Sequence, residues 1–204
     1  MDVKENFYTA ADLFESTVST IPEAKWDLPG LGNWSIRSLV GHGLRAMTTV
    51  LEYQGKQSNT SSPNQIHDPA GYFLAANIDD PEVTNAIEKR GVQAGLELGA
   101  NPLEKISEAV LQVKGFVRGA PLDLPMVTRM GEMTLATYLP TRTFELSVHS
   151  TDLATALGED LVLPESLYFE VISILAHIAR QKGGGTDLVK FLTGRVASLP
   201  KPIF

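Results

Sequence analysis

Four side chains of the kinds that bind metal ions or transfer protons recur at helical spacing late in the chain. Arg142, Glu145, His149 and Asp152 are separated by three, four and three residues. Because an α-helix has 3.6 residues per turn, a helix over this segment places all four on one stripe. The residues around them are mostly apolar, and isolated charges are costly to bury among apolar side chains. The spacing therefore predicts that the four side chains act together in a site.

Glu145 and His149 form the pair best placed to bind one metal ion, because residues four apart on a helix point to the same spot. A third ligand must come from elsewhere, and His42 lies within another expected helix. Two imidazoles and one carboxylate suit zinc, and sites with three protein ligands generally keep a fourth position open for water or substrate. Nickel, iron or manganese would also accept these ligands. The sequence thus predicts a catalytic metal site rather than a structural one.

Arg142 and Asp152 lie about one helical turn on either side of the ligand pair. Asp152 is a candidate to accept a hydrogen bond from the second ring nitrogen of His149, as outer carboxylates commonly do for ligating histidines. Arg142 could hold Glu145 in place or face an anionic substrate. An alternative stays open, in which these residues form ordinary pairs on a helix surface, worth roughly 0.2–0.5 kcal/mol each.

The composition limits the classes of protein to which the chain can belong. A hydrophobic content of 43% and a charged content of 20% over 204 residues are typical of a soluble globular protein. The net charge of −7 and the scattered Lys and Arg residues argue against a nucleic-acid partner. The absence of cysteine excludes disulfides, thiolate metal sites and a cysteine nucleophile. The N-terminal residues do not form a signal peptide and the apolar runs are too short to span a membrane, so we expect a cytoplasmic protein with no membrane partner.

Apolar periodicity and helix-start signals predict a mainly α protein, a single domain over residues 1–204. Ser35 and Thr134 are expected N-caps, and Gly158 is the expected stop of the helix that carries the four polar residues. A short hairpin is expected over residues 126–134, with its turn near Gly131. The expected helices cover residues 6–19, 35–53, 72–77, 80–98, 101–118, 134–157, 164–182 and 187–192.

The remaining histidines and the two tryptophans carry weaker signals. His67 lies in a polar segment and is expected to be exposed. His177 is expected to be an ordinary helix residue rather than a metal ligand. Trp26 and Trp34 flank a segment that contains proline and glycine. We expect both indoles to pack at the end of the bundle.

Two segments together resemble a known family. Residues 34–42, Trp-Ser-Ile-Arg-Ser-Leu-Val-Gly-His, and residues 142–153, Arg-Thr-Phe-Glu-Leu-Ser-Val-His-Ser-Thr-Asp-Leu, are similar to the mycothiol-dependent maleylpyruvate isomerase family of the DinB/YfiT-like superfamily. The segment Leu-Thr-Gly-Arg at residues 192–195 also resembles that family. The resemblance implies a DinB-like four-helix bundle, the N-terminal metal-binding domain of the isomerase. It also implies a divalent metal, usually zinc, held by His42, Glu145 and His149.

The resemblance further implies that mycothiol or a related thiol takes part in the reaction. A metal in such a site would bind the sulfur as thiolate and lower the pKa of the thiol. An oxyanion of an acidic substrate would meet Arg45 or Arg142, which with Asp152 complete the expected catalytic residues. The full isomerase carries a further C-terminal α/β domain that supplies an arginine. This chain reaches Phe204 where the bundle should finish, so we expect that domain to be absent.

The expected function is therefore activation of a low-molecular-weight thiol for transfer to, or isomerisation of, a small electrophilic substrate. Two alternatives remain. Water in place of thiol at the metal would make the protein a metal-dependent hydrolase. A bundle whose polar stripe is structural would instead be a non-catalytic metal-binding or regulatory protein. A monomer or an isologous homodimer is expected, since such dimers are the commonest oligomers.

Overall fold

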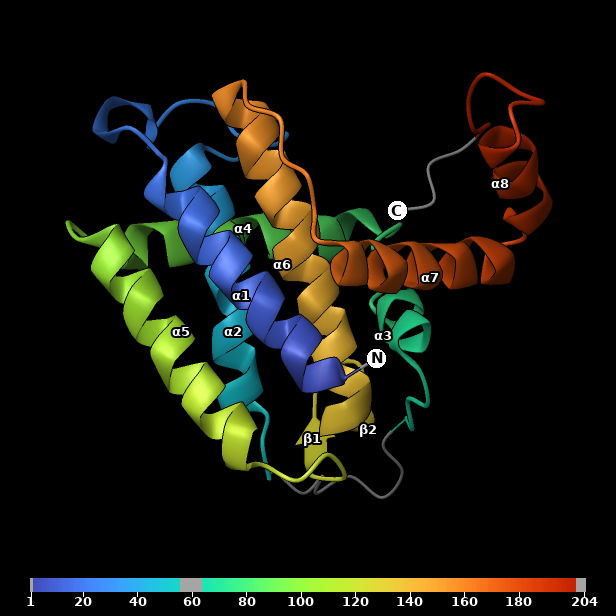
Figure 1. Cartoon of the computed structure of the whole chain (residues 1–204), viewed down its shortest axis with the longest axis horizontal. Coiled ribbons are helices and arrows are strands. Elements are labelled where there is room, and N and C mark those ends of the chain that lie inside the picture. The colour runs from blue at the N-terminus through green and yellow to red at the C-terminus, as the bar shows by residue number, and fades with distance from the viewer. Residues whose placement is uncertain (1, 56–63, 201–204) are drawn as a thin grey trace.

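The computed structural model describes residues 2–55 and 64–200 of the chain. Within them the protein is mainly α-helical, with eight α-helices and one antiparallel hairpin of two strands (Figure 1). The predicted fold class is confirmed. The helices are α1 Val3–Ser19, α2 Ile36–Glu52, α3 Pro69–Ala75, α4 Pro81–Glu97, α5 Pro102–Gly119, α6 Leu135–Leu157, α7 Glu165–Gln181 and α8 Gly185–Leu192, and the strands are β1 Pro125–Val127 and β2 Glu132–Thr134.

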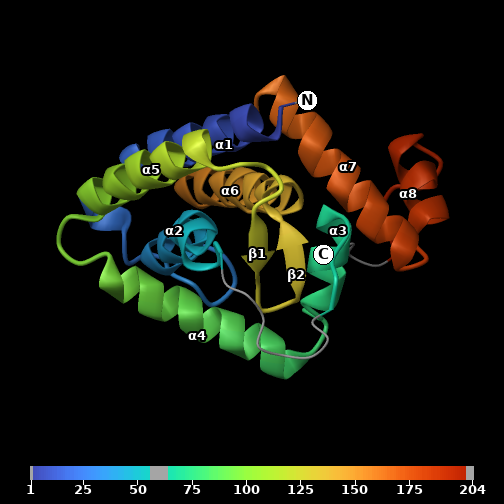
Figure 2. The same cartoon turned by 90° about the horizontal axis from the view of Figure 1, so that it is seen from below.

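Helices α1, α2, α5 and α6 form the central bundle (Figure 2). Helices α5 and α6 each contact both α1 and α2, so the four enclose one core. Phe7 and Phe14 of α1 and Leu139 and Leu146 of α6 are fully buried in it. Each pair is separated by seven residues, about two helical turns, so each helix turns one apolar stripe inward. This arrangement is the predicted four-helix bundle.

The ends of α6 follow signals in the sequence. The Thr134 hydroxyl accepts a hydrogen bond from the Thr137 N–H at 3.3 Å, as an N-cap does. Gly158 ends the helix with a φ of 76°, a left-handed conformation that glycine adopts without steric cost. Two other helices begin three residues earlier than predicted because Asp2 and Asp68 act as N-caps, which start α1 at residue 3 and α3 at residue 69.

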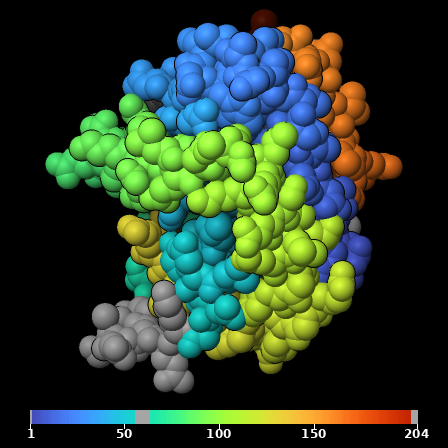
Figure 3. Space-filling model, turned by 90° about the vertical axis from the view of Figure 1, so that its left-hand side faces the viewer, coloured from blue at the N-terminus to red at the C-terminus, as the bar shows by residue number. Residues whose placement is uncertain are grey.

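Helix α4 crosses α2 at a contact that only glycine permits. A Cβ added at Gly41 of α2 would lie 2.2 Å from the backbone nitrogen of Gly95 in α4. On the other side of α2, a Cβ at Gly43 would lie 2.3 Å from the Phe14 ring of α1. Figure 3 shows α4 and the start of α5 as a band across the side of α2. The two glycines flank His42, so the segment that carries this histidine is packed closely against two helices.

Helices α3, α7 and α8 lie around the bundle. Helix α7 contacts α1, α3 and α6, and α8 packs against α7 at the side of the molecule away from the bundle (Figure 1). In the described part of the chain, no helix has the length and apolar character that crossing a membrane requires. The extent of the domain over residues 1–204 stays a prediction.

Candidate metal centre

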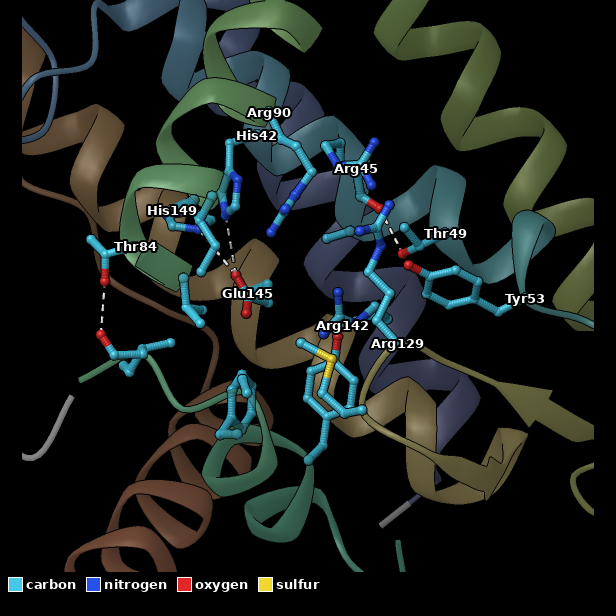
Figure 4. A pocket seen from close by; sticks show the side chains of 18 of the residues that line it. His42, Arg45, Thr49, Tyr53, Thr84, Arg90, Arg129, Arg142, Glu145 and His149 are labelled. Carbon is cyan, nitrogen blue, oxygen red and sulfur yellow. Dashed lines mark hydrogen bonds and ion pairs between the residues drawn. The ribbon is translucent and has the colours of Figure 1, made fainter. Parts of the chain in front are cut away.

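The three predicted ligands come together at one wall of a pocket (Figure 4). Nε2 of His149 lies 3.1 Å from Oε2 of Glu145, and Nε2 of His42 lies 3.8 Å from the same oxygen. One candidate ligand atom from each residue lies within 4.8 Å of the other two. Ligand atoms about 2.0–2.2 Å from a tetrahedral zinc ion are roughly 3.3–3.6 Å from one another. The two measured separations bracket that value, so the three residues fit a divalent ion.

Helices α2 and α6 of the bundle position these side chains. Helix α6 brings Glu145 and His149 to one spot because four residues complete about one turn. Helix α2 supplies His42 from the opposite side, and the two imidazole centroids are 4.9 Å apart. Nδ1 of His42 is buried and has no hydrogen-bond partner among the described residues. Such a buried polar atom is kept where the residue has a task besides stabilising the fold.

Burial and hydrogen bonds set the charges at the site. Burial lowers the pKa of His42 and keeps this imidazole neutral, the form that binds metal. Burial also opposes a charge on His149, but hydrogen bonds to Asp152 and Glu145 outweigh it and raise the pKa of His149 to about 9. For Glu145 burial favours the neutral acid, yet the hydrogen bond from His149, the nearby imidazole of His42 and the charge of Arg142 hold its pKa well below the ordinary value. In the metal-free protein, a His149 imidazolium therefore faces a Glu145 carboxylate.

We expect the metal affinity of the protein to rise with pH between pH 7 and pH 9. His149 with a pKa of about 9 is protonated at neutral pH, and it must release that proton before it can bind a metal. Each pH unit up to about 9 should strengthen the apparent affinity by up to about tenfold, and the dependence should then level off. Zinc titration against a competing chelator at pH 7, 8 and 9 measures this slope. A flat profile would contradict the assignment of His149 as a ligand.

Asp152 lies behind His149, on the side away from the pocket. Its Oδ2 is 3.0 Å from Nδ1 of His149, the geometry predicted for a carboxylate that orients a ligating imidazole. Asp152 is not among the described residues that line the pocket, so it acts on a bound molecule only through His149. The alternative of exposed helix-surface pairs is wrong, since Arg142 and His149 are only 6% and 8% exposed.

Substitution Asp152→Asn should weaken metal binding about 10–100-fold while leaving the three ligands in place. The amide carries no negative charge and accepts a weaker hydrogen bond from Nδ1–H of His149, so the imidazole is held less firmly and loses part of its basicity. Competitive zinc titration of Asp152→Asn beside the wild type checks this. Asp123→Asn, which removes the same charge from an exposed residue, serves as the control and should bind zinc as the wild type does. Equal affinities for all three proteins would remove Asp152 from the site.

The pocket in front of the ligands has a volume of about 370 Å³. Trp34 lies against His42, with ring centroids 4.6 Å apart, and its indole N–H donates a hydrogen bond to the Glu88 carbonyl at 3.0 Å. Trp26 packs in the core as predicted. Trp34 is partly buried against the core, and it also lines the pocket and covers one face of a candidate ligand. The indole thereby limits the access of water to His42.

Arg142 lines the pocket between two aromatic rings. Its guanidinium carbon lies 4.9 Å from the centroid of Tyr72 and 4.8 Å from that of Tyr138. Nε donates to the Thr141 hydroxyl at 2.9 Å, whereas Nη2 is buried without a partner among the described residues. No ion pair joins Arg142 to Glu145 within residues 2–55 and 64–200. Of the two roles predicted for Arg142, the structure therefore favours facing a bound anion over holding Glu145.

The pocket is also lined by two arginines that the sequence analysis did not single out. Arg90 of α4 and Arg129 of the hairpin turn lie near Arg45 of α2, which was predicted (Figure 4). A signal for Arg90 exists, because Val83 and Ile87 precede it by seven and three residues and share its helix face. Arg129 has no such signal, since its place depends on how the hairpin packs on the bundle.

Comparison with curated proteins and with solved structures gave no match. A family model does match: the one described as the mycothiol maleylpyruvate isomerase N-terminal domain covers residues 7–154. This range contains most of α1, all of α2 to α5, most of α6 and all three candidate ligands, and the family implies the DinB/YfiT-like fold. Because the match covers well over half of the 204 residues, the chain belongs to the mycothiol maleylpyruvate isomerase N-terminal domain family, as its two motifs predicted.

Proposed function

We propose that this protein is a metal-dependent enzyme that activates a low-molecular-weight thiol, of the mycothiol type, for transfer to or isomerisation of a small electrophilic substrate. The observation that carries the proposal is the convergence of His42, Glu145 and His149 at the wall of a pocket. Membership of a family named for a mycothiol-dependent isomerase supports the choice of thiol. Zinc suits two imidazoles and one carboxylate best, and nickel is the second choice.

A divalent ion held by the three residues would bind the thiol sulfur as thiolate and lower its pKa, which supplies a nucleophile at neutral pH. The protein's own residues do the rest. Asp152 orients His149, and Trp34 shields His42 from water. Burial opposes the charge of Arg142, but Tyr138 and the other nearby groups outweigh it and raise the pKa of this side chain. Arg142 is thus a permanent cation at the pocket wall.

Thiol-dependent turnover tests this proposal. Zinc-loaded protein is incubated with mycothiol and a panel of small electrophiles, and thioether formation and electrophile isomerisation are followed by mass spectrometry. The expected result is product that requires both the thiol and the metal. Product without thiol would instead indicate metal-assisted hydrolysis. Stoichiometric metal without any thiol-dependent product would indicate a non-catalytic metal-binding bundle.

A further inference from the structure

The two histidines of the candidate metal centre are held in different ways. Nδ1 of His149 faces the Asp152 carboxylate at 3.0 Å, which is the usual partner of a ligating imidazole. Nδ1 of His42 is buried and has no hydrogen-bond partner among the described residues, and its Nε2 lies 3.8 Å from Glu145, beyond hydrogen-bond distance. The torsion that turns a histidine ring has a broad energy minimum. No hydrogen bond within the described residues therefore fixes the orientation of the His42 ring.

The indole of Trp34 lies along the His42 ring instead. The two ring centroids are 4.6 Å apart and the planes are inclined at 33°, a separation at which aromatic rings are in van der Waals contact. A rotation of the imidazole out of this plane would drive its edge into the indole, which is itself partly buried against the core. The indole thus restricts the ring of His42 as Asp152 restricts that of His149.

Helix α4 determines the position of this indole. The Trp34 N–H donates a hydrogen bond to the Glu88 carbonyl of α4 at 3.0 Å. A Cβ added at Gly91, one turn later on the same face of α4, would lie 2.7 Å from two carbons of the indole. Only glycine at position 91 therefore leaves room for the ring. Trp34 directly precedes α2, but both of these contacts that fix its indole come from α4.

We propose that Trp34 is a positioning residue of the metal centre: held by α4 at Glu88 and Gly91, its indole fixes the His42 ring in the orientation that binds the metal ion. Trp34 acts on a bound ion only through His42. The inference rests on the metal site of the proposed function, and it does not depend on the thiol or on the reaction. It gives a tryptophan the task that a hydrogen-bonded carboxylate performs for the other histidine.

Competitive zinc titration of tryptophan variants is the first test. Trp34→Leu keeps an apolar side chain but removes the flat ring, and it should weaken zinc binding about tenfold, the lower limit for loss of a group that orients a ligand. Trp34→Phe keeps a flat ring and loses only the N–H, so its affinity should stay within about threefold of the wild type. Trp26→Phe is the matched control, because Trp26 is buried and is not among the described residues that line the pocket. This control should bind zinc as the wild type does.

The visible absorption of the cobalt(II)-loaded proteins separates positioning from a purely structural role. This spectrum depends on the number and geometry of the ligands. We expect Trp34→Leu to change the intensity and position of the bands, because His42 no longer holds its place at the metal, and Trp34→Phe to restore the wild-type spectrum. A lower free energy of unfolding of metal-free Trp34→Leu, with an unchanged cobalt spectrum and unchanged zinc affinity, would overturn the proposal.

Substitution Gly91→Ala tests the contribution of α4 while Trp34 and His42 both stay in the chain. The added methyl group displaces the indole, so zinc binding should weaken and the cobalt spectrum should change in the same direction as in Trp34→Leu. Gly115→Ala is the control, because a Cβ there meets nothing within 4 Å among the described residues. Wild-type zinc affinity and a wild-type cobalt spectrum in Gly91→Ala would show that α4 does not set the position of the indole, which would overturn the proposal.

Failure of the metal assignment is distinguishable from failure of the positioning role. Retained zinc in both His42→Ala and His149→Ala would overturn the metal centre itself. Zinc that is lost in both histidine variants but is bound normally by Trp34→Leu and Gly91→Ala would overturn only the role of Trp34. Zinc lost in the histidine variants and weakened in Trp34→Leu and Gly91→Ala, but not in Trp26→Phe or Gly115→Ala, supports both.

Discussion

Replacement of His149 by alanine is expected to abolish stoichiometric zinc binding. Its Nε2 lies 3.1 Å from Oε2 of Glu145, and the only other imidazole in the cluster, His42, comes from the opposite helix. Two ligands from different helices bind zinc far less strongly than three, so the loss should exceed the roughly 10–100-fold effect of losing an outer carboxylate. Elemental analysis of purified wild type and His149→Ala, both reconstituted with zinc and then dialysed, measures the change.

His67→Ala is the matched control for this experiment. His67 is exposed and lies outside the cluster formed by His42, Glu145 and His149. The His67→Ala protein should retain its full zinc content, which would show that loss of an imidazole elsewhere does not affect zinc binding. Thiol-dependent turnover should disappear together with the zinc of His149→Ala. Full zinc content in His149→Ala would refute the ligand assignment, and the pocket would then need another explanation.

The largest expected effect on stability comes from Gly41→Ala. The added methyl group would lie 2.2 Å from the Gly95 nitrogen and 2.5 Å from the Ala94 carbonyl carbon, both backbone atoms that cannot rotate away. Helices α2 and α4 must therefore separate, which opens the packing along their whole contact. Overpacking commonly costs about 1–3 kcal/mol, and a clash between two backbones belongs at or above the upper limit. Urea unfolding of the metal-free protein should show a lower free energy of unfolding by about 3 kcal/mol or more.

Gly115→Ala in α5 is the control for that measurement. A Cβ there meets nothing within 4 Å among the described residues, and the residue is exposed in the middle of a helix. The same chemical change should therefore stabilise the protein by about 0.5–1 kcal/mol, because alanine loses less backbone entropy in a helix than glycine does. Similar free energies of unfolding for Gly41→Ala and the wild type would show that the two helices do not meet as closely as the structure has them.

The local sequence predicted the helices and one half of the site well. Thr134 and Gly158 bound α6 as expected, and the spacing of Glu145 and His149 determines that they meet. These features depend on neighbours within a few residues, which is the range that periodicity and capping report. The starts at Asp2 and Asp68 were missed because short polar residues act as caps only when the following turn becomes helical.

The sequence could not show which side chains from distant elements share the pocket. His42 was proposed as the third ligand from its residue type and the family resemblance, because no spacing rule connects it to α6, and Arg129 lies on a turn whose position depends on tertiary packing. Arg142 illustrates the same limit, because the sequence does not show whether its guanidinium group reaches Glu145 or faces the pocket. The two aromatic rings beside its guanidinium group belong to Tyr72 of α3 and Tyr138 of α6, and no spacing rule relates Tyr72 to Arg142.

The glycine contact between α2 and α4 has a consequence for how the size of the pocket can vary. The backbones of α2 and α4 already meet at Gly41 and Gly95, so the two helices cannot move closer together to narrow the pocket that both of them line. The space between these two helices then depends on the side chains that line it, among them Ile87 and Arg90 of α4. Substitution of those two residues would change the shape and charge of the pocket without replacing any of the three candidate metal ligands on α2 and α6.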